Sequence, residues 1–365
     1  MAQYQKGSEF ELLKMLKIGV VGGGHIVKHR HIPVFEKIKD VEVHAICDKQ
    51  ESIAKSVAEQ FGIRNSFTSL SEMLKEELDI VDICTPPHTH FSLATEAMEA
   101  GCHVLVEKPL AMTIKDVDEM FRVSKRENVK LCVLHQNLFN PAFQKAKRLV
   151  EEGVVGDVIS VDVGTFVRRD NYMCVNGEHW CHRLPGGIFF EILPHPVYLL
   201  QVFLKNSEPA HVLTKKLSDF SWMKTDEARV LLDADNGAGL IFASCNSPFH
   251  GDSINIFGSN MCLQVDLWGR SVIKYKPRTE DPYSVGKGNL SLAFQFLTLI
   301  GATISNSFTM FSGGVKVSAH YGFLREFLRS IQSDSELPVS EEEARENVRI
   351  VASICEQIDD SVSNT

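Results

Sequence analysis

An acid and a base stand directly after an apolar run in the segment 102–112, CHVLVEKPLAM. The apolar run predicts a buried strand, and Pro109 ends it because proline cannot donate a hydrogen bond to a sheet. Proline also holds the residue before it extended, so Lys108 is presented where the strand ends. Ligands of open parallel sheets bind outside the carboxyl ends of strands, which makes Glu107 and Lys108 candidate ligand-contacting residues. The alternative is a solvated charge pair at a strand exit.

A second candidate is His195, in the segment 186–200, GGIFFEILPHPVYLL. Pro194 and Pro196 flank it, and since proline is tolerated only in the first turn of a helix, a helix must begin here. An imidazole beside a loop can take or return a proton near neutral pH, which oxidation of an alcohol requires when hydride leaves the same carbon. The alternative is a capping or structural histidine.

A glycine cluster, GVVGGGHIVKH, follows the first apolar run and opens a helix. Free backbone amides at a helix start can hold a pyrophosphate, with Gly22 in the tight turn and Gly24 at the close approach. Asp48 ends the next apolar run, where it can accept hydrogen bonds from ribose hydroxyls and repel a 2′-phosphate, which favours NAD over NADP. A simple glycine-rich turn is the alternative. The pattern has Val27 where a third small residue is usual, and the cofactor-contacting candidates at the helix start are His25 and Ile26.

Apolar runs and helical patterns alternate along the first part of the chain. Strands are expected at 17–21, 41–48, near 66, at 79–85, 103–107 and 129–135, with helices after the glycine cluster to about 39 and at 51–60, 70–77, 89–101 and 114–128. Strands that are nearly continuously apolar and alternate with helices predict a parallel sheet covered on both faces. The fold class is therefore α/β, with a doubly wound parallel sheet of the Rossmann type over residues 15–137.

The rest of the chain, 138–365, reads as a second domain of the α+β class. A helix at 140–156 has Asn140 as N-cap and Pro141 in its first turn. Six strand candidates separated by short turns lie between 157 and 268 and predict a mostly antiparallel sheet. Helices are expected at 315–332 and 341–359, the second opened by a capping box of Ser340 and Glu343. Residues 1–14 resemble the translation of a cloning linker and are left out of the fold argument.

Composition narrows the function classes. With 365 residues, two domains are the working expectation, and the formal charge of −9 without a Lys/Arg run argues against nucleic-acid or anionic-membrane partners. The longest apolar runs are shorter than the roughly 20 residues of a membrane helix. Nine cysteines without CxxC pairs favour reduced thiols and a cytoplasmic location. The expected partner is a small molecule.

Three segments together, GVVGGGHI, ICTPPHTHFSLATEAMEAGCHVLVEKPLA and PGGIFFEILPHPVYLL, resemble the glucose-fructose oxidoreductase and inositol dehydrogenase (Gfo/Idh/MocA) family over nearly all of residues 15–360. The resemblance implies an N-terminal Rossmann domain, a C-terminal α+β domain with an open, mostly antiparallel sheet, a nicotinamide between them, and a homo-oligomer, either a dimer or a tetramer. Carried over, it implies that Thr85 and Pro86 line the ribose and nicotinamide side. It also implies that Glu107 and Lys108 contact the nicotinamide ribose and that Lys108 reaches the substrate.

The family usually carries an aspartate four residues before its histidine, where this chain has Glu191. The charge is kept on a longer arm, which would orient His195 and stabilise its protonated form. His90, just after the Thr-Pro turn, is a further cofactor-side candidate. Lys108, His195 and Glu191 are thus the candidate catalytic residues, and the sequence leaves open whether Lys108 or His195 accepts the proton.

The segment 166–187, FVRRDNYMCVNGEHWCHRLPGG, is long enough for a functional loop. Trp180 is expected to stack on a sugar face, and Arg168, Arg169 or Arg183 to hold a carboxylate or phosphate; solvent-facing charges are the alternative. Gln136, between the domains, is a further substrate-binding candidate. The Cys and His residues of this loop fit no ordinary zinc spacing, so no metal is expected. The histidines near the glycine cluster, His25, His29 and His31, are expected on a helix surface rather than as metal ligands.

Two functions remain open. The first is an NAD-dependent dehydrogenase or reductase acting on a hydroxyl-bearing carbon of a sugar, a sugar derivative (nucleotide sugars included) or a cyclic polyol. The second is a non-catalytic NAD or sugar sensor on the same fold, which the glutamate at 191 keeps open. Retention of both Lys108 and His195 favours the enzyme. The individual substrate depends on loop side chains whose directions a sequence does not give.

Overall fold

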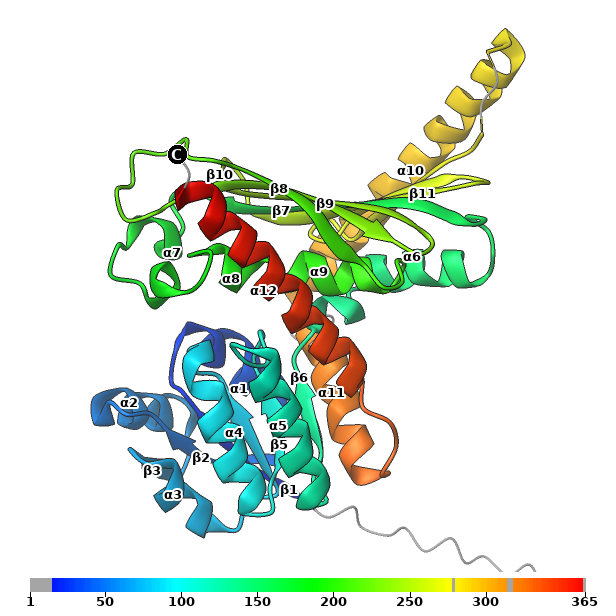
Figure 1. Ribbon diagram of the computed structural model, residues 1–365. Coiled ribbons are helices and arrows are strands. Elements are labelled where there is room, and N and C mark those ends of the chain that lie inside the picture. The colour runs from blue at the N-terminus through cyan, green and yellow to red at the C-terminus, as the bar shows by residue number, and fades with distance from the viewer. Residues whose placement is uncertain (1–14, 278–279, 314–317, 364–365) are drawn as a thin grey trace, which may run out of the picture.

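The computed structural model describes residues 15–277, 280–313 and 318–363, which build two sheets and their helices (Figure 1). The linker-like residues 1–14 lie outside the described part. The lower layer in Figure 1 is a six-stranded sheet and the upper one a seven-stranded sheet. In the described part of the chain, none of the helices combines the length and apolarity that a bilayer crossing needs.

The first sheet is entirely parallel, with strand order β3-β2-β1-β4-β5-β6. Its strands are β1 (Leu16–Val21), β2 (Val41–Cys47), β3 (Asn65–Phe67), β4 (Ile80–Ile83), β5 (His103–Val106) and β6 (Leu131–Val133). This is the order of a dinucleotide-binding doubly wound sheet, and it confirms the predicted Rossmann fold. The switch point lies between β1 and β4, so a ligand crevice is expected outside their carboxyl ends.

Helices cover both faces of this sheet (Figure 1). The helices along this part of the chain are η1 (Val27–His31), α1 (Ile32–Phe35), α2 (Glu51–Phe61), α3 (Leu70–Met73), η2 (Leu74–Glu76), η3 (Pro87–Thr89), α4 (His90–Glu99), α5 (Ile114–Arg126) and η4 (Gln136–Phe139). The continuous helix predicted after the glycine cluster is instead a π-helical turn, η1, followed by one short α-helical turn. A π-helical turn adds one residue, which rotates the residues after it by about 100° relative to an uninterrupted α-helix.

The second sheet has the order β13-β12-β11-β7-β10-β9-β8 and is antiparallel except where β7 pairs with β10. The strands are β7 (Val158–Arg168), β8 (Glu208–Lys215), β9 (Glu227–Ala234), β10 (Gly237–Ser247), β11 (Gly251–Gly258), β12 (Cys262–Asp266) and β13 (Ser271–Tyr275). Strand β13 was not predicted. The mostly antiparallel second sheet is as predicted.

One face of the second sheet is covered by helices that also reach the first domain (Figure 1). The helices of this part are α6 (Pro141–Glu151), α7 (Tyr172–Val175), η5 (Trp180–Arg183), α8 (Phe189–Ile192), α9 (Pro194–Gln201) and α12 (Glu341–Ser363). The predicted N-cap of α6 is present, since the Asn140 side chain accepts from the Ala142 amide. The predicted capping box of α12 is also present between Ser340 and Glu343.

The two remaining helices differ from the sequence prediction. The start of the predicted helix 315–332 lies outside the described residues, and the described helix is α11 (Ala319–Gln332). Its apolar face, with Phe323 and Phe327, packs in the core of the first domain, so the chain returns to that domain after the predicted boundary at 137/138. Helix α10 (Pro282–Gly313) was not predicted and projects from the edge of the second sheet (Figure 1).

Candidate active site

The glycine loop after β1 has the backbone that a phosphate-binding turn needs. Gly22 has φ +99°, and a Cβ there would lie 2.7 Å from the Cys84 carbonyl oxygen, so the tight turn requires glycine. A Cβ on Gly24 would meet no atom within 4 Å, which leaves open space over this part of the loop. The loop therefore fits close approach of a pyrophosphate at Gly24.

Asp48 holds this loop in place. Its carboxylate accepts hydrogen bonds from the Gly23 amide (2.8 Å) and the Gln50 amide (2.9 Å). The side chain is half-buried, at the carboxyl end of β2. Asp48 thus braces the loop and places a negative charge beside the switch point.

The Thr-Pro turn after β4 is braced by His90. This histidine is fully buried, and its ring nitrogens lie 2.7 Å from the Thr85 carbonyl oxygen and 2.9 Å from the Pro109 carbonyl oxygen. It joins the exits of β4 and β5, which differs from the expected direct contact with a cofactor. Thr85 and Pro86 themselves lie at the strand exit, where the Thr85 hydroxyl lies 2.6 Å from that of Thr89. Burial lowers the pKa of His90, although its contacts with the two backbone carbonyls oppose this shift.

Lys108 connects the two domains. It follows β5, and its peptide bond to Pro109 is cis. Its ammonium donates to the Glu191 carboxylate and, at 2.9 Å, to the Glu191 carbonyl oxygen. The lysine and glutamate side chains are only 10% and 17% exposed. Lys108 therefore spans the domain junction, and Glu191 is its partner.

This pairing corrects the role predicted for Glu191. We expected its carboxylate to orient His195, but it contacts Lys108, because α8 turns it toward the exit of β5. Burial raises the pKa of Glu191, although the Lys108 charge opposes this shift.

His195 lies in the first turn of α9, as predicted, although the short helix α8 runs almost directly into it. Its Nδ1 lies 2.9 Å from the Tyr198 hydroxyl, and the same hydroxyl oxygen accepts from the Asn137 amide at 3.2 Å. The Tyr198 ring stacks on His135, with ring centroids 4.3 Å apart. Burial lowers the pKa of His195 well below its usual value, and the Lys108 charge acts in the same direction. A neutral imidazole and an ammonium therefore share one site.

Beneath Glu107 lies a buried group that the sequence analysis did not predict. His31 is completely buried, which corrects its expected place on a helix surface; its exposed neighbours His25 and His29 are at the surface as predicted. The His31 ring lies between Asp82 on β4 and Glu107 after β5, with nitrogen to oxygen distances of 2.7 Å and 3.0 Å. Burial would raise the pKa of Glu107, but its contact with His31, together with the Lys108 charge, outweighs this and lowers it to about 2.

Among the cofactor-side candidates at the start of the first helix, His25 is exposed and its ring lies 4.2 Å from that of His29. Ile26 is partly buried against the core of the first domain. Both residues come directly after Gly24 in the chain, where the backbone borders open space. The structure thus keeps both residues beside the loop that would hold a pyrophosphate.

The substrate candidates are less enclosed. Gln136 lies just after His135, and its Oε1 is buried without a hydrogen-bond partner, which fits a site awaiting a donor. Arg168 and Arg183 are 54% and 74% exposed and pair with the nearby Asp170 and Glu178. Trp180 is half-buried, with its ring tilted 34° against His179.

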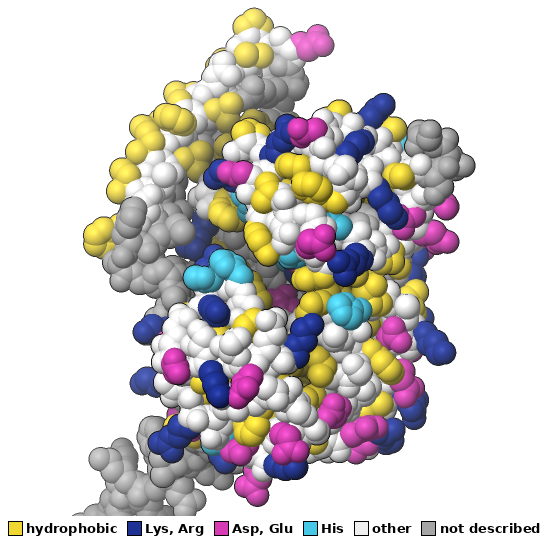
Figure 2. Space-filling model, turned by 90° about the vertical axis from the view of Figure 1, so that its left-hand side faces the viewer, with side chains coloured by type: hydrophobic (Ala, Val, Ile, Leu, Met, Phe, Trp, Pro, Cys, Tyr) yellow, Lys and Arg dark blue, Asp and Glu magenta, His cyan; other side chains and the backbone are white. Residues whose placement is uncertain are grey.

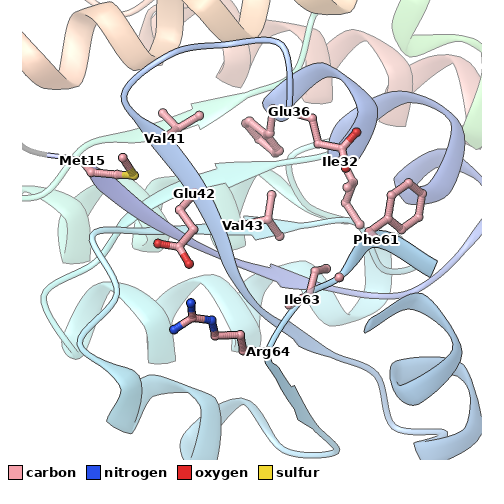
Figure 3. Close-up of a pocket in the computed structure, with 11 residues that line it drawn as sticks. Met15, Ile32, Glu36, Val41, Glu42, Val43, Phe61, Ile63 and Arg64 are labelled. Carbon is pink, nitrogen blue, oxygen red and sulfur yellow. The ribbon is translucent and has the colours of Figure 1, made fainter. Parts of the chain in front are cut away.

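Two cavities of the structure can be compared with the position of Lys108 and His195, and neither residue lines them. One of about 390 Å³ is lined by the arginines of the long loop and by Phe220, Ser247 and Pro248. Another of about 410 Å³ lies at the amino ends of β1 and β2, between Met15, Val43 and Arg64, away from the strand exits (Figure 3). The space-filling view shows a hollow between the two domains, with histidine side chains at its edge (Figure 2). The candidate active site is at this junction.

Several site residues were missed from the sequence. His135 follows β6, so the rule that pointed to Lys108 at a strand exit would also have found it. Tyr198 lies three residues after His195 on a helix, a spacing that brings side chains together. Asp82 had the clearest signal, because a carboxylate within an apolar strand needs a buried partner.

Three groups of the first domain are also close enough to be considered as metal ligands. Ligand atoms of His31, Asp82 and Cys84 lie within 4.8 Å of one another. The residues of the long loop that were considered for zinc are arranged differently: Cys174 lies 4.0 Å from the Cys245 carbonyl oxygen, and Trp222 donates to the Cys174 carbonyl.

Comparison with known proteins gives the relationship of this chain. Residues 16–135 match the model of the oxidoreductase family with an NAD-binding Rossmann fold, and residues 143–264 match the GFO/IDH/MocA C-terminal domain. Myo-inositol 2-dehydrogenase of Thermotoga maritima is 31% identical over 262 residues, which are 67% of this chain and 73% of that protein. Oxidoreductase P35 of Formosa agariphila is 28% identical over 187 residues. The aligned residues are 50% of this chain and 58% of the length of P35.

Solved structures give the same fold. The WlbA dehydrogenase from Bordetella pertussis, crystallised with NADH and UDP-GlcNAcA, has a TM-score of 0.78 at 23% identity and covers 95% of this chain and 96% of its own. The two domain models match in order, and a relative above 30% identity is aligned over most of its length. The chain therefore belongs to the Gfo/Idh/MocA family of oxidoreductases with an NAD-binding Rossmann domain.

Proposed function

We propose that this protein is an NAD(H)-dependent dehydrogenase or reductase acting on a hydroxyl-bearing carbon of a sugar, a sugar derivative or a cyclic polyol. The observation that carries the proposal is the junction of Lys108, Glu191 and His195. One of these residues comes from the exit of β5 and two from the helices beneath the second sheet. Relatives with such activities include the myo-inositol dehydrogenase and a D-glucoside 3-dehydrogenase of Escherichia coli, 30% identical over 144 residues, 39% of this chain and 41% of that protein.

The cofactor would be held by the loop from Gly22 to Ile26, by Asp48, by the Thr85-Pro86 turn and by Glu107. When bound, the nicotinamide supplies the acceptor or donor of hydride. The open backbone at Gly24 supports this placement. The protein contributes orientation, proton exchange and charge.

His195 is the proton acceptor in this proposal. Its ring is neutral near pH 7 because burial and the Lys108 charge both disfavour its protonated form. Since Nδ1 is engaged by Tyr198, Nε2 is the nitrogen left for a substrate hydroxyl. The Lys108 ammonium, held by Glu191, stabilises negative charge that develops on the same oxygen.

NAD rather than NADP is the proposed cofactor. The Asp48 carboxylate at the end of β2 would accept from ribose hydroxyls and repel a 2′-phosphate. Titration of the protein with NADH and NADPH, followed by cofactor fluorescence, tests this preference. Equal affinities would contradict it.

A cytoplasmic location is part of the proposal. All nine cysteines are free in the structure. Free thiols are typical of a reducing compartment. Fractionation of cells that express the protein is the direct test.

The deciding experiment is reduction of NAD with a panel of cyclic polyols, free sugars, acidic sugars and nucleotide sugars. A substrate should produce NADH with the intact protein, and much more slowly with His195→Asn or Lys108→Met. An exposed lysine in the same domain, Lys75, gives the matched control Lys75→Met, which should behave like the unaltered protein. NADH binding without turnover on any member of the panel would favour the sensor instead.

The protein is also proposed to work as a homo-oligomer, and helix α10 supports this. Its 32 residues include a single charged side chain, Lys287. Seven large side chains are 59–73% exposed: Tyr283, Leu290, Phe294, Phe296, Leu297, Ile304 and Phe308. These offer on the order of 900 Å² of apolar surface, comparable to the ~800 Å² per partner of a stable interface. Figure 2 shows this yellow surface along the projecting helix.

A second copy of the chain is the occupant that fits this helix. Helix α10 is anchored to the sheet edge by the Gln295 side-chain amide, which makes hydrogen bonds of 2.8 Å and 2.9 Å with the backbone of Lys274. Light scattering of the intact protein should give a dimer or tetramer. Phe294→Glu with Phe308→Glu should reduce the mass, whereas Leu217→Glu, equally exposed elsewhere, should not. A monomeric intact protein would contradict the proposal.

A further inference from the structure

Asp82 is an unusual residue for its position. It lies within β4 between Val81 and Ile83, in the centre of the parallel sheet, and is completely inaccessible to solvent. A buried carboxylate without a charged partner is strongly destabilising, so this aspartate requires a cation or a proton. Its partner in the structure is His31, at 2.7 Å, and its other oxygen has no hydrogen-bond partner.

His31 contacts a second carboxylate with its other ring nitrogen. Nε2 lies 3.0 Å from Glu107 Oε1, while Nδ1 faces Asp82. A neutral imidazole has a single N–H and could donate to only one of these oxygens. Two ionised carboxylates on opposite nitrogens therefore select the imidazolium.

The remaining groups around His31 do not compete for this charge. The Cys84 thiol lies 3.4 Å from Nδ1, and burial raises its pKa, so it stays protonated. The His320 ring, 6.2 Å away on α11, is neutral, because burial and then the His31 and Arg30 charges lower its pKa to about 3. Burial alone would lower the pKa of His31, but the Asp82 carboxylate raises it well above its usual value.

Glu107 is fixed on both of its oxygens. Oε1 accepts from His31, and Oε2 accepts from the Lys108 amide at 3.1 Å. Its side chain is 12% exposed, so it reaches the surface of the site, one residue before the lysine that joins the domains. The Glu107 carboxylate, at the exit of β5, is therefore held in place by the buried His31 ring.

We propose that His31 is a positioning residue whose imidazolium, held by Asp82, keeps the Glu107 carboxylate ionised and oriented toward the nicotinamide ribose. This rests on the proposed function, because the ribose contact of Glu107 belongs to it. Glu107 touches the cofactor, whereas His31 acts through Glu107. The π-helical turn η1 serves this arrangement, since it turns His31 inward from the same segment that leaves His29 at the surface.

The experiment removes the buried cation without leaving its partner unpaired. The double variant His31→Leu with Asp82→Val replaces the buried ion pair by apolar groups, a change that folded proteins often tolerate. NADH affinity is then measured by fluorescence from pH 5.5 to 9. The intact protein should show a flat profile; the double variant should bind about tenfold more weakly at pH 5.5, the loss expected for one hydrogen bond to a charged group, and should recover toward pH 9 as Glu107 ionises.

Two comparison variants separate positioning from simple damage. Glu107→Gln cannot ionise, so its NADH affinity should be reduced by a similar factor at every pH. His29→Gln, at the exposed end of the same helical turn, should match the intact protein. A double variant whose affinity loss does not change with pH, or that shows no loss, would overturn the role of His31.

A second measurement does not depend on cofactor binding or on the double variant. Ring nitrogen chemical shifts from nuclear magnetic resonance should show His31 with both nitrogens protonated at pH 7.5, and His135 and His195 neutral. A neutral His31, or stoichiometric metal in the purified protein bound through His31 and Cys84, would overturn the proposal. If His31 is cationic but the intact protein binds no NADH, the proposed function fails while the buried cation stands.

Discussion

The two walls of the candidate site are built differently. On the Rossmann wall, three polar side chains each lie between two partners: His31 between two carboxylates, His90 between two carbonyls, and Asp48 between two amides. On the wall formed by residues 168–187, Arg168 and Arg183 are exposed and pair with acids two and five residues away in sequence. Contacts between groups far apart in sequence hold the side chains of the first wall in place. The side chains of the second wall are held only by weak ion pairs between near neighbours in sequence.

The difference follows from what each wall has to recognise. A dinucleotide is the same in every member of a cofactor-dependent family, so its wall can be prebuilt, and preorganised contacts lower the cost of binding. A substrate differs from one relative to the next, and surface ion pairs of ~0–1 kcal/mol are readily exchanged for contacts with a ligand. The comparison predicts that substitutions on the first wall act on stability and on every substrate, and those on the second on substrate choice.

The largest effect is expected at Lys108, the residue that joins the walls. Lys108→Met removes the ammonium beside the reacting oxygen and should reduce turnover by about 10²–10⁴-fold. NADH affinity should change much less, because the glycine loop and Asp48 remain. Steady-state kinetics with any substrate found in the panel, together with NADH titration, measure both. A variant with full turnover would show that the two walls do not act together.

The glycine loop gives a matched pair on the first wall. Gly22→Ala places a Cβ 2.7 Å from a backbone oxygen at φ +99°, so the unfolding free energy should fall by about 1–3 kcal/mol or more. Gly24→Ala meets no neighbour and should leave stability within about 0.5 kcal/mol of the intact protein. NADH affinity should fall in both variants. Denaturant unfolding and fluorescence titration are the measurements, and unchanged NADH binding by Gly24→Ala would contradict the placement of the pyrophosphate.

Two buried histidines, His135 and His31, should affect stability oppositely: one lowers it as pH falls, and the other lowers it as pH rises. Burial lowers the pKa of His135 to about 3, below an unfolded value of about 6.5. Its contribution is therefore lost as pH falls below 6.5, by about 1.4 kcal/mol per pH unit. The pKa of His31 is raised, so its contribution is complete below pH 6.5 and is lost as pH rises toward the raised value.

His135→Phe isolates the first of these contributions while keeping a ring against Tyr198. Urea unfolding from pH 4.5 to 9 should show a shallower loss on the acid side for this variant and an unchanged alkaline side. Asp82→Asn should instead reduce the alkaline slope, because it weakens the hold on the His31 proton. Identical profiles for the two variants would mean that the histidines do not differ in charge.

The parts of the fold that the sequence predicted are those with local signals. Strand and helix alternation, the caps at Asn140 and Ser340, and the helix start at Pro194 depend on neighbours within a few residues. The π-helical turn η1 has no local residue signal. Helix α10 lacks a regular polar face, although Asp281 caps its start by accepting a hydrogen bond from the Ser284 amide. The chain's return into the first core through α11 depends on tertiary packing, which a pattern does not specify.

The motif residues of the site could be predicted from the sequence, but the side chains that they contact could be predicted less well. The Lys108 charge acts on the pKa of His195, and a shared catalytic site for the two residues stays a prediction. The partner of Glu191 was predicted incorrectly because four residues along a chain say little once α8 and α9 turn between them. His31 meets Asp82 and Glu107 across 51 and 76 residues of sequence, a separation that only the folded sheet closes.

The smallest effects are expected on the second wall. Arg183→Gln removes an ion pair between side chains that are 74% and 90% exposed, so the unfolding free energy should stay within about 0.5 kcal/mol. Arg168→Gln should be equally neutral for stability, because its partner Asp170 is also exposed. If Arg168 binds an anionic substituent, its loss should raise KM for acidic or nucleotide-linked sugars and leave KM for neutral polyols unchanged. An equal effect on neutral and acidic substrates would mean that this wall, too, acts on the shared chemistry, and the division between the two walls would fail.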